Sequence, residues 1–182
     1  MSIRLKDWDY SHNWYYFVTI CTGDKKPSFG NIANERMKLS PHGLLAQQCW
    51  AEIPFHFPFV VLDEFVIMPD HVHGIVIIDH SNGQGNGNCR DVAVQRPYNG
   101  LAETMSAISP KAGSLSVVIR SYKSVVTKMI GIADTHAHFS WQPRFFDRII
   151  RNERELDAVR AYIRNNPLKW KLDRDHPDNI EF

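Results

Sequence analysis

The stretch FVVLDEFVIMPDHVHGIVII, residues 59–78, carries the clearest structural signal in the chain. It holds two runs of β-branched and aromatic residues on either side of Pro69-Asp70, and such runs are typical of β-strands. Asp63-Glu64 indicates a bend inside the first run. The predicted partner strands are residues 59–68 and 71–78.

Before this stretch, the sequence predicts one strand and one helix. Residues 14–21, WYYFVTIC, are β-branched and aromatic and are expected to form a strand. Ser40-Pro41 is typical of a helix N-cap followed by a first-turn proline. We therefore expect a helix from about residue 41 to 53, ended by Pro54.

After it, the sequence predicts a helix, a short strand and a last helix. Apolar residues recur at helical spacing from about residue 115 to 130, and residues 145–150 are strand-like. The last helix is expected over 153–165, with Asn152 as its cap and Pro167 just past its end.

This order of elements predicts an α+β fold. It matches the ferredoxin-like split βαβ sandwich, in which an antiparallel sheet carries helices on one face, here followed by a further C-terminal helix. A length of 182 residues suits one domain, so residues 1–182 are predicted to form a single domain. The Gly- and Asn-rich residues 81–100 are expected to form a flexible loop within it.

Composition limits the location and the binding mode. The net charge of +1 is weak for a nucleic-acid binder, so any such site must be a local basic patch. The three cysteines are far apart and form no CxxC, which argues against a disulfide framework and a thiolate zinc site. The chain has no signal-peptide core and no apolar run of ~18 residues, so we expect a cytoplasmic protein.

His71 and His73 are candidate metal ligands. Side chains alternate across a strand, so these two imidazoles share one face, and together they can supply half of a metal site. In a regular strand Asp70 would point away from them, or it could fix the turn instead. The pair could equally be two half-exposed histidines at the start of a strand.

Tyr162 and Asn166 are four residues apart and share one face of the last helix. The Asn166 amide oxygen could be a third ligand for Mg²⁺ or Mn²⁺, and a helix C-terminus favours a nearby cation. Pro167 is expected to end the helix at Asn166. The alternatives are ordinary packing for the tyrosine and a helix C-cap for the asparagine.

Together these residues could perform phosphodiester chemistry. A metal held by two histidines and an amide can polarise a phosphate oxygen, and a tyrosine hydroxyl can then attack to give a phosphotyrosine and a free 3′-hydroxyl. The covalent link conserves the phosphodiester energy, so no ATP site is needed. The sequence has no GxxxxGK[ST] motif, which agrees.

Two motifs resemble a known family. FVIMPDHVHGIVII (65–78) resembles the HUH signature of single-tyrosine transposases, and WQPRFFDRIIRNERELDAVRAYIRNNPLKW (141–170) resembles REP-associated tyrosine transposases and their relatives in the smallest bacterial insertion sequences. The resemblance covers about residues 14–170 without the Gly/Asn loop. It implies a ferredoxin-like fold and single-stranded, often hairpin-ended DNA as substrate. The implied roles are nucleophile for Tyr162 and metal ligands for His71, His73 and Asn166.

DNA contacts are predicted from basic residues near these motifs. Phosphate contacts position a protein on DNA, and the alternative for each residue is a solvated surface. Arg144, Arg148 and Arg151 cluster just before the last helix and are the stronger candidates, and Arg120 and Lys123 lie on the middle helix. A homodimer is also compatible with the resemblance, so Tyr162 could act within one chain or across two.

Other functions remain as alternatives. The main one is a domesticated relative that binds hairpin DNA but no longer cuts it, and another is an HUH enzyme of replication or conjugation. A histidine-triad hydrolase would need a histidine where Ile75 stands, and a cupin would need ligands on later strands. A second HxH, His136 and His138, is expected in a loop where alternation does not hold.

Overall fold

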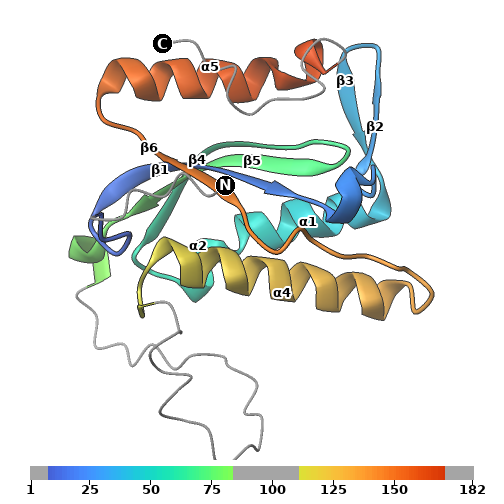
Figure 1. The fold of residues 1–182 in the computed structure, drawn as a ribbon, viewed down its shortest axis with the longest axis horizontal. Coiled ribbons are helices and arrows are strands. Elements are labelled where there is room, and N and C mark those ends of the chain that lie inside the picture. Colours follow the sequence, from blue (N-terminus) through green and yellow to red (C-terminus); the bar gives the residue numbers. More distant parts are fainter. Residues whose placement is uncertain (1–7, 84–110, 171–182) are drawn as a thin grey trace, which may run out of the picture.

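A computed structural model describes residues 8–83 and 111–170 of the chain (Figure 1). Most of the predicted 81–100 loop lies outside the described residues, as does the tail 171–182. Of the predicted loop, only residues 81–83 are described, and they lie in the short 3-10 helix η2 (His80–Gly83). Another short 3-10 helix, η1 (Gly23–Lys25), follows the first strand.

A four-stranded antiparallel sheet forms the centre of the fold. Its strand order is β4-β5-β1-β6. The strands are β1 (Trp14–Cys21), β4 (Val60–Ile67), β5 (His71–Ile78) and β6 (Phe146–Ile149). Because β5 lies between β1 and β4, the units β1-α1-β4 and β5-α4-β6 interleave, which is the split βαβ arrangement. The α+β, ferredoxin-like prediction is confirmed.

Helices cover both faces of this sheet (Figure 1). On one face lie α1, the short α2 and α4, and on the opposite face lies α5 alone. Their bounds are α1 (Pro41–Ala51), α2 (Ile53–His56), α4 (Leu115–Ala133) and α5 (Glu153–Lys169). The C-terminal helix that carries Tyr162 is therefore separated from the other helices by the sheet.

The helix starts follow the predicted caps. The Ser40 hydroxyl accepts a hydrogen bond from the Gly43 amide at the start of α1, and Asn152 does the same for the Glu155 amide at the start of α5. The first helix ends two residues before the predicted position 53, and Pro54 lies in the first turn of α2. A proline fits a first helical turn because the amide it lacks would have no partner there.

The predicted end of the last helix was wrong. The helix continues through Asn166 and Pro167 to Lys169. In the final turn, Pro167 removes only the amide that would bond to the Ile163 carbonyl. Ile163 and Asn166 are both buried, so packing against the sheet keeps this turn helical.

Sequence patterns missed a small hairpin, β2 (Gly30–Ala33) with β3 (Arg36–Leu39). Asn34 and Glu35 form its two-residue turn, and both have positive φ, as such hairpin turns require. Glycine is the usual residue at the second of these positions. Because this chain has Glu35 there, the sequence does not indicate the turn.

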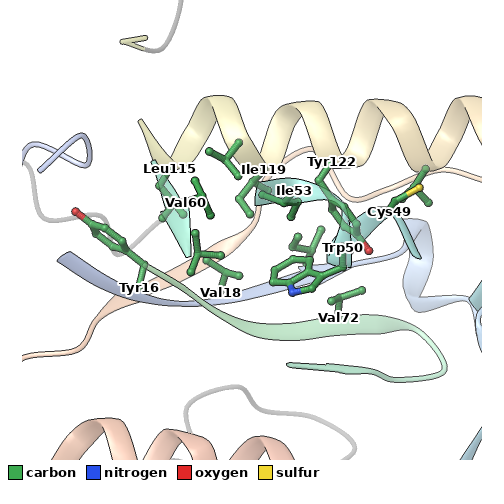
Figure 2. Close-up of a cluster of buried hydrophobic side chains, with 14 of the residues drawn as sticks. Tyr16, Val18, Cys49, Trp50, Ile53, Val60, Val72, Leu115, Ile119 and Tyr122 are labelled. Atoms are coloured by element: carbon green, nitrogen blue, oxygen red, sulfur yellow. The ribbon is translucent and has the colours of Figure 1, made fainter. Parts of the chain in front are cut away.

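The larger hydrophobic core lies between the sheet and the α1/α4 layer. Trp50 of α1 meets Tyr122 of α4 edge-on (Figure 2). Trp50 also stacks on Phe65 of β4. Trp50 also fills the space beside Gly74, where an added Cβ would lie only 2.3 Å from the indole ring. A smaller core lies under α5 and consists of Phe17, Ile75, Ile150, Leu156, Val159 and Ile163.

The predicted bend in β4 is a β-bulge. Leu62 pairs with Val76 and Phe65 pairs with Gly74, so Asp63 and Glu64 stand opposite a single residue of β5. No helix in the two described ranges is long and apolar enough to cross a membrane.

Candidate active site

His71 and His73 lie side by side on the face of the sheet that α5 covers. Their ring centroids are 4.4 Å apart with an interplanar angle of 68°. The intervening Val72 belongs to the core on the opposite face. Strand alternation therefore places both imidazoles between β5 and α5.

The Nδ1 atom of each imidazole has a fixed partner. His71 Nδ1 donates to Asp70 Oδ1 at 2.6 Å, and His73 Nδ1 lies 2.8 Å from the Thr19 hydroxyl of β1. Asp70 does not point away from the histidines, as it would in a regular strand, because the chain bends at residues 69–70 and alternation does not apply there. With both Nδ1 atoms engaged, the Nε2 atoms are the ones available to a ligand.

His73 is held in the neutral form that binds metals. Its side chain is only 2% exposed and stacks on Phe17, with ring centroids 5.3 Å apart. Burial, with a further contribution from His71, lowers the pKa of His73 well below the usual histidine value. His71 Nε2 is buried and has no hydrogen-bond partner among the described residues, which is costly for a polar atom unless another group satisfies it.

The structure brings Tyr162 to these histidines. Its hydroxyl lies 3.4 Å from His73 Nε2, at the long end of hydrogen-bond distance. The Tyr162 ring meets Phe17 edge-on, with centroids 6.0 Å apart, and this contact orients the side chain. Residues 89 positions apart in the sequence thus share one site.

Asn166 lies between two residues that contact the histidines, Tyr162 within α5 and Trp170 directly after its end. Tyr162, one turn earlier, reaches His73, and Trp170, one turn later, lies against His71 with ring centroids 5.7 Å apart. Residues four apart share a helix face, so Asn166 faces the same gap. Its side chain is buried, with 5% exposure.

These residues fit a divalent metal. The Nε2 atoms of His71 and His73 and the amide oxygen of the buried Asn166 offer two nitrogens and one oxygen on facing elements. In the described parts of the chain, no group of three or more His, Cys, Asp or Glu side chains is placed to bind a metal. Beside the two histidines, the buried Asn166 amide could supply an oxygen as a third ligand.

The basic residues predicted on the middle helix lie away from this site. Arg120 is exposed on α4, on the opposite side of the sheet from α5 (Figure 1). The Lys123 ammonium donates to the Gln142 carbonyl at 2.5 Å, and burial lowers the pKa of Lys123. Lys123 thus anchors the segment that leads into β6.

The basic residues around β6 lie on the approach to α5. Arg144 and Arg151 are exposed on either side of the strand, and Arg148 within it pairs with Glu155 at 3.6 Å. His136 and His138 are both exposed in the segment after α4. No described contact joins that second pair to His71 or His73.

Sequence patterns missed four residues that contact the histidines: Phe17, which stacks on His73, and Thr19, Asp70 and Trp170. Thr19 lies directly opposite His73 in the β1–β5 register, so counting the strand pairing would have found it. Asp70 depends on the bend before β5, and Trp170 depends on the unpredicted last turn of α5.

Comparison with known proteins gives a family and a fold. No family model matches the chain. An uncharacterized protein of Haemophilus influenzae is 37% identical over 178 residues, which is 97% of this chain and 93% of that protein. The chain belongs to the same family as this protein.

A solved structure of a REP-associated tyrosine transposase bound to a REP hairpin has the same fold. It superposes with a TM-score of 0.58 and 17% sequence identity, covering 93% of this chain and 74% of the transposase. The fold of this family member is therefore that of a tyrosine transposase, in agreement with the resemblance of residues 65–78 and 141–170.

Proposed function

We propose that this protein is a metal-dependent transposase or endonuclease that cleaves and rejoins single-stranded DNA through a 5′-phosphotyrosine intermediate. The observation that carries the proposal is the 3.4 Å approach of the Tyr162 hydroxyl to His73 Nε2. This approach supports the proposal because it brings a tyrosine hydroxyl close to two imidazoles whose Nδ1 atoms are hydrogen-bonded.

The proposed step forms one bond and breaks one. The Tyr162 oxygen bonds to phosphorus, and the bond from phosphorus to the 3′-oxygen breaks. The phenol loses a proton and the departing 3′-oxygen gains one, so no net proton is consumed. The 5′ end stays on the enzyme, and attack by a 3′-hydroxyl reverses the step and joins strands.

His71, His73 and Asn166 would hold the metal. When bound, a divalent cation supplies positive charge to the phosphate oxygens and stabilises the charge that develops in the transition state. Asp70 and Thr19 orient the two imidazoles, as outer partners of metal-binding histidines do.

The proposed substrate is single-stranded or hairpin DNA. Tyr162 is half-buried between α5 and the sheet, so a strand must leave its base stack to bring a phosphate to the hydroxyl. Exposed Arg144 and Arg151 can contact phosphates on the approach to α5. The REP hairpin bound to the structurally similar transposase supports this choice of substrate.

Covalent trapping tests the proposal. Wild-type protein and a Tyr162→Phe variant are incubated with end-labelled hairpin DNA and Mn²⁺, then separated on a denaturing gel. We expect a metal-dependent shifted band that the variant lacks. Tyr15→Phe is the matched control, because Tyr15 is 40% exposed at the far end of β1 and should leave the band unchanged.

Three results would contradict parts of the proposal. An adduct that persists in Tyr162→Phe would exclude this nucleophile. Hairpin binding without any adduct, across a library of hairpins, would favour a domesticated DNA-binding protein. Equal cutting of perfect duplex would refute the preference for single strands.

A further inference from the structure

Two acidic residues of β4 hold one side of α5. Arg160 donates to Asp63 through both Nε and Nη2, at distances from 2.6 to 3.2 Å. One turn later, Arg164 donates to Glu64 Oε1 at 2.8 Å. Two adjacent residues of one strand thus pair with two arginines on one flank of the helix that carries Tyr162.

The β-bulge makes this double contact possible. Adjacent residues of a regular strand point to opposite faces, so only one of two acids could reach α5. Leu62 and Phe65 both pack against the larger core. The bulge places two residues between them instead of one, so neither Asp63 nor Glu64 has to point towards that core. The Glu64 amide donates to Asp63 Oδ1 at 2.7 Å and stabilises the bulge.

Apolar packing alone would not fix the rotation of α5. Burial of Val159 and Ile163 favours contact with the sheet, but the hydrophobic effect has no directionality. The arginine–carboxylate contacts are directional, and the fork of Arg160 matches a carboxylate in only a few geometries. Tyr162 lies on the opposite flank of the buried stripe, so rotation of the helix would move its hydroxyl away from His73.

We propose that Asp63 and Glu64 are positioning residues that hold α5 in the rotation at which Tyr162 meets His73. This inference rests on the proposed function, because it assigns these acids a role in the reaction of Tyr162. The acids contact Arg160 and Arg164 and act on Tyr162 through the helix.

The Asp63–Arg160 pair is the stronger half of this arrangement. Its side chains are 15% and 30% exposed, whereas those of Glu64 and Arg164 are 36% and 55% exposed. Burial acts to raise the pKa of Asp63, but the hydrogen bonds from Arg160 and the Glu64 amide outweigh it and lower the pKa. Asp157 also holds Arg160 from within α5, at 3.2 Å.

The test compares three variants. Asp63→Asn removes the charge but keeps an oxygen for the Glu64 amide, so the bulge is preserved. Asp63→Arg with Arg160→Asp reverses the pair. Asp9→Asn breaks a comparably short ion pair with Lys111, 2.6 Å, far from the site, and is the control. Single-turnover adduct formation, hairpin affinity and thermal unfolding are measured for each.

We expect Asp63→Asn to slow adduct formation by up to ~10²-fold, the effect of a small misplacement of a reacting group. Hairpin affinity should change less than about twofold and Tm should change little, because partly exposed ion pairs contribute little stability. The reversed pair should recover much of the rate, and Asp9→Asn should match the wild type.

Amide hydrogen exchange supplies a readout that does not need activity. Asp63→Asn should speed exchange in α5 and leave α4 unchanged. Unchanged exchange in α5, a full rate of adduct formation, or parallel loss of rate and affinity would overturn the positioning role. Absence of an adduct in the wild type would instead refute the proposed function, and the exchange experiment would still decide whether the acids hold α5.

Discussion

The two faces of the sheet differ in what they contain. The face under α1 and α4 carries the larger core, with fully buried aromatic side chains such as Trp50 and Tyr16. The face under α5 has a small apolar cluster bordered by His71, His73 and Tyr162. Most of the buried apolar side chains thus lie on one face and the candidate site lies on the other, and the strands β1 and β5 contribute to both.

The largest expected effect is on the α5 face. Replacing both His71 and His73 by alanine should reduce Mn²⁺-dependent adduct formation by about 10³-fold, because both nitrogen ligands are lost. The assay is the covalent trap with hairpin DNA over a range of Mn²⁺ concentrations. His136→Ala with His138→Ala is the matched control, since that pair has the same spacing and is exposed. Undiminished activity without His71 and His73 would exclude them as ligands.

The second prediction concerns the larger core. Trp50→Ala should lower the free energy of unfolding by about 3–5 kcal/mol, because it removes a fully buried indole and leaves a cavity. Ile163→Ala under α5 should cost about 2 kcal/mol, because the smaller cluster can settle around the gap. Urea unfolding measures both. An equal or larger loss at Ile163 would mean that the α5 face contributes as much stability as the opposite face.

The third prediction separates orientation from ligation. Thr19→Val keeps the side-chain shape but removes the hydroxyl beside His73 Nδ1, so apparent Mn²⁺ affinity should fall ~10–100-fold. Thr127→Val removes an exposed hydroxyl that bonds to the Lys123 carbonyl on α4 and should have no effect on metal affinity. A wild-type Mn²⁺ titration curve for Thr19→Val would show that the hydroxyl does not orient the imidazole.

The smallest expected effects are at the helix caps. Ser40→Ala and Asn152→Ala should each cost about 1 kcal/mol of stability, because each removes one acceptor for a helix amide. Only Asn152→Ala should also slow adduct formation, because it loosens the start of α5. Thermal unfolding and the trapping assay separate the two, and equal slowing by Ser40→Ala would contradict a division of roles between the faces.

The regular parts of the fold could be predicted from local patterns. Strand composition placed β1 and β5, and the Ser40-Pro41 and Asn152 signals placed the starts of α1 and α5. The β2–β3 turn was missed because Asn34 and Glu35 both have positive φ there. Glycine is common in such turns, and without it the sequence does not indicate one. Local propensity also placed the end of α5 too early, since tertiary packing overrides the effect of Pro167.

The site was predictable only in part. Alternation places His71 and His73 on one face, but the approach of Tyr162 to His73 depends on how α5 crosses the sheet. The partner of His73, Thr19, is 54 residues away, and its position follows from the register of β1 and β5. Asp70 reaches His71 because of an irregular bend, which no periodic pattern describes.

Gly74 couples the two faces through one strand position. It follows His73 directly, and its missing side chain is replaced by the Trp50 ring on the other side of the sheet. Any larger residue there would displace either the indole or the backbone that carries His73. Dense packing leaves no space for both the indole and an added side chain. The tolerance of this position to mutation is therefore set by a tryptophan on the face of the sheet opposite His73. Substitutions at residues 50 and 74 should therefore occur as compensating pairs among homologues of this protein.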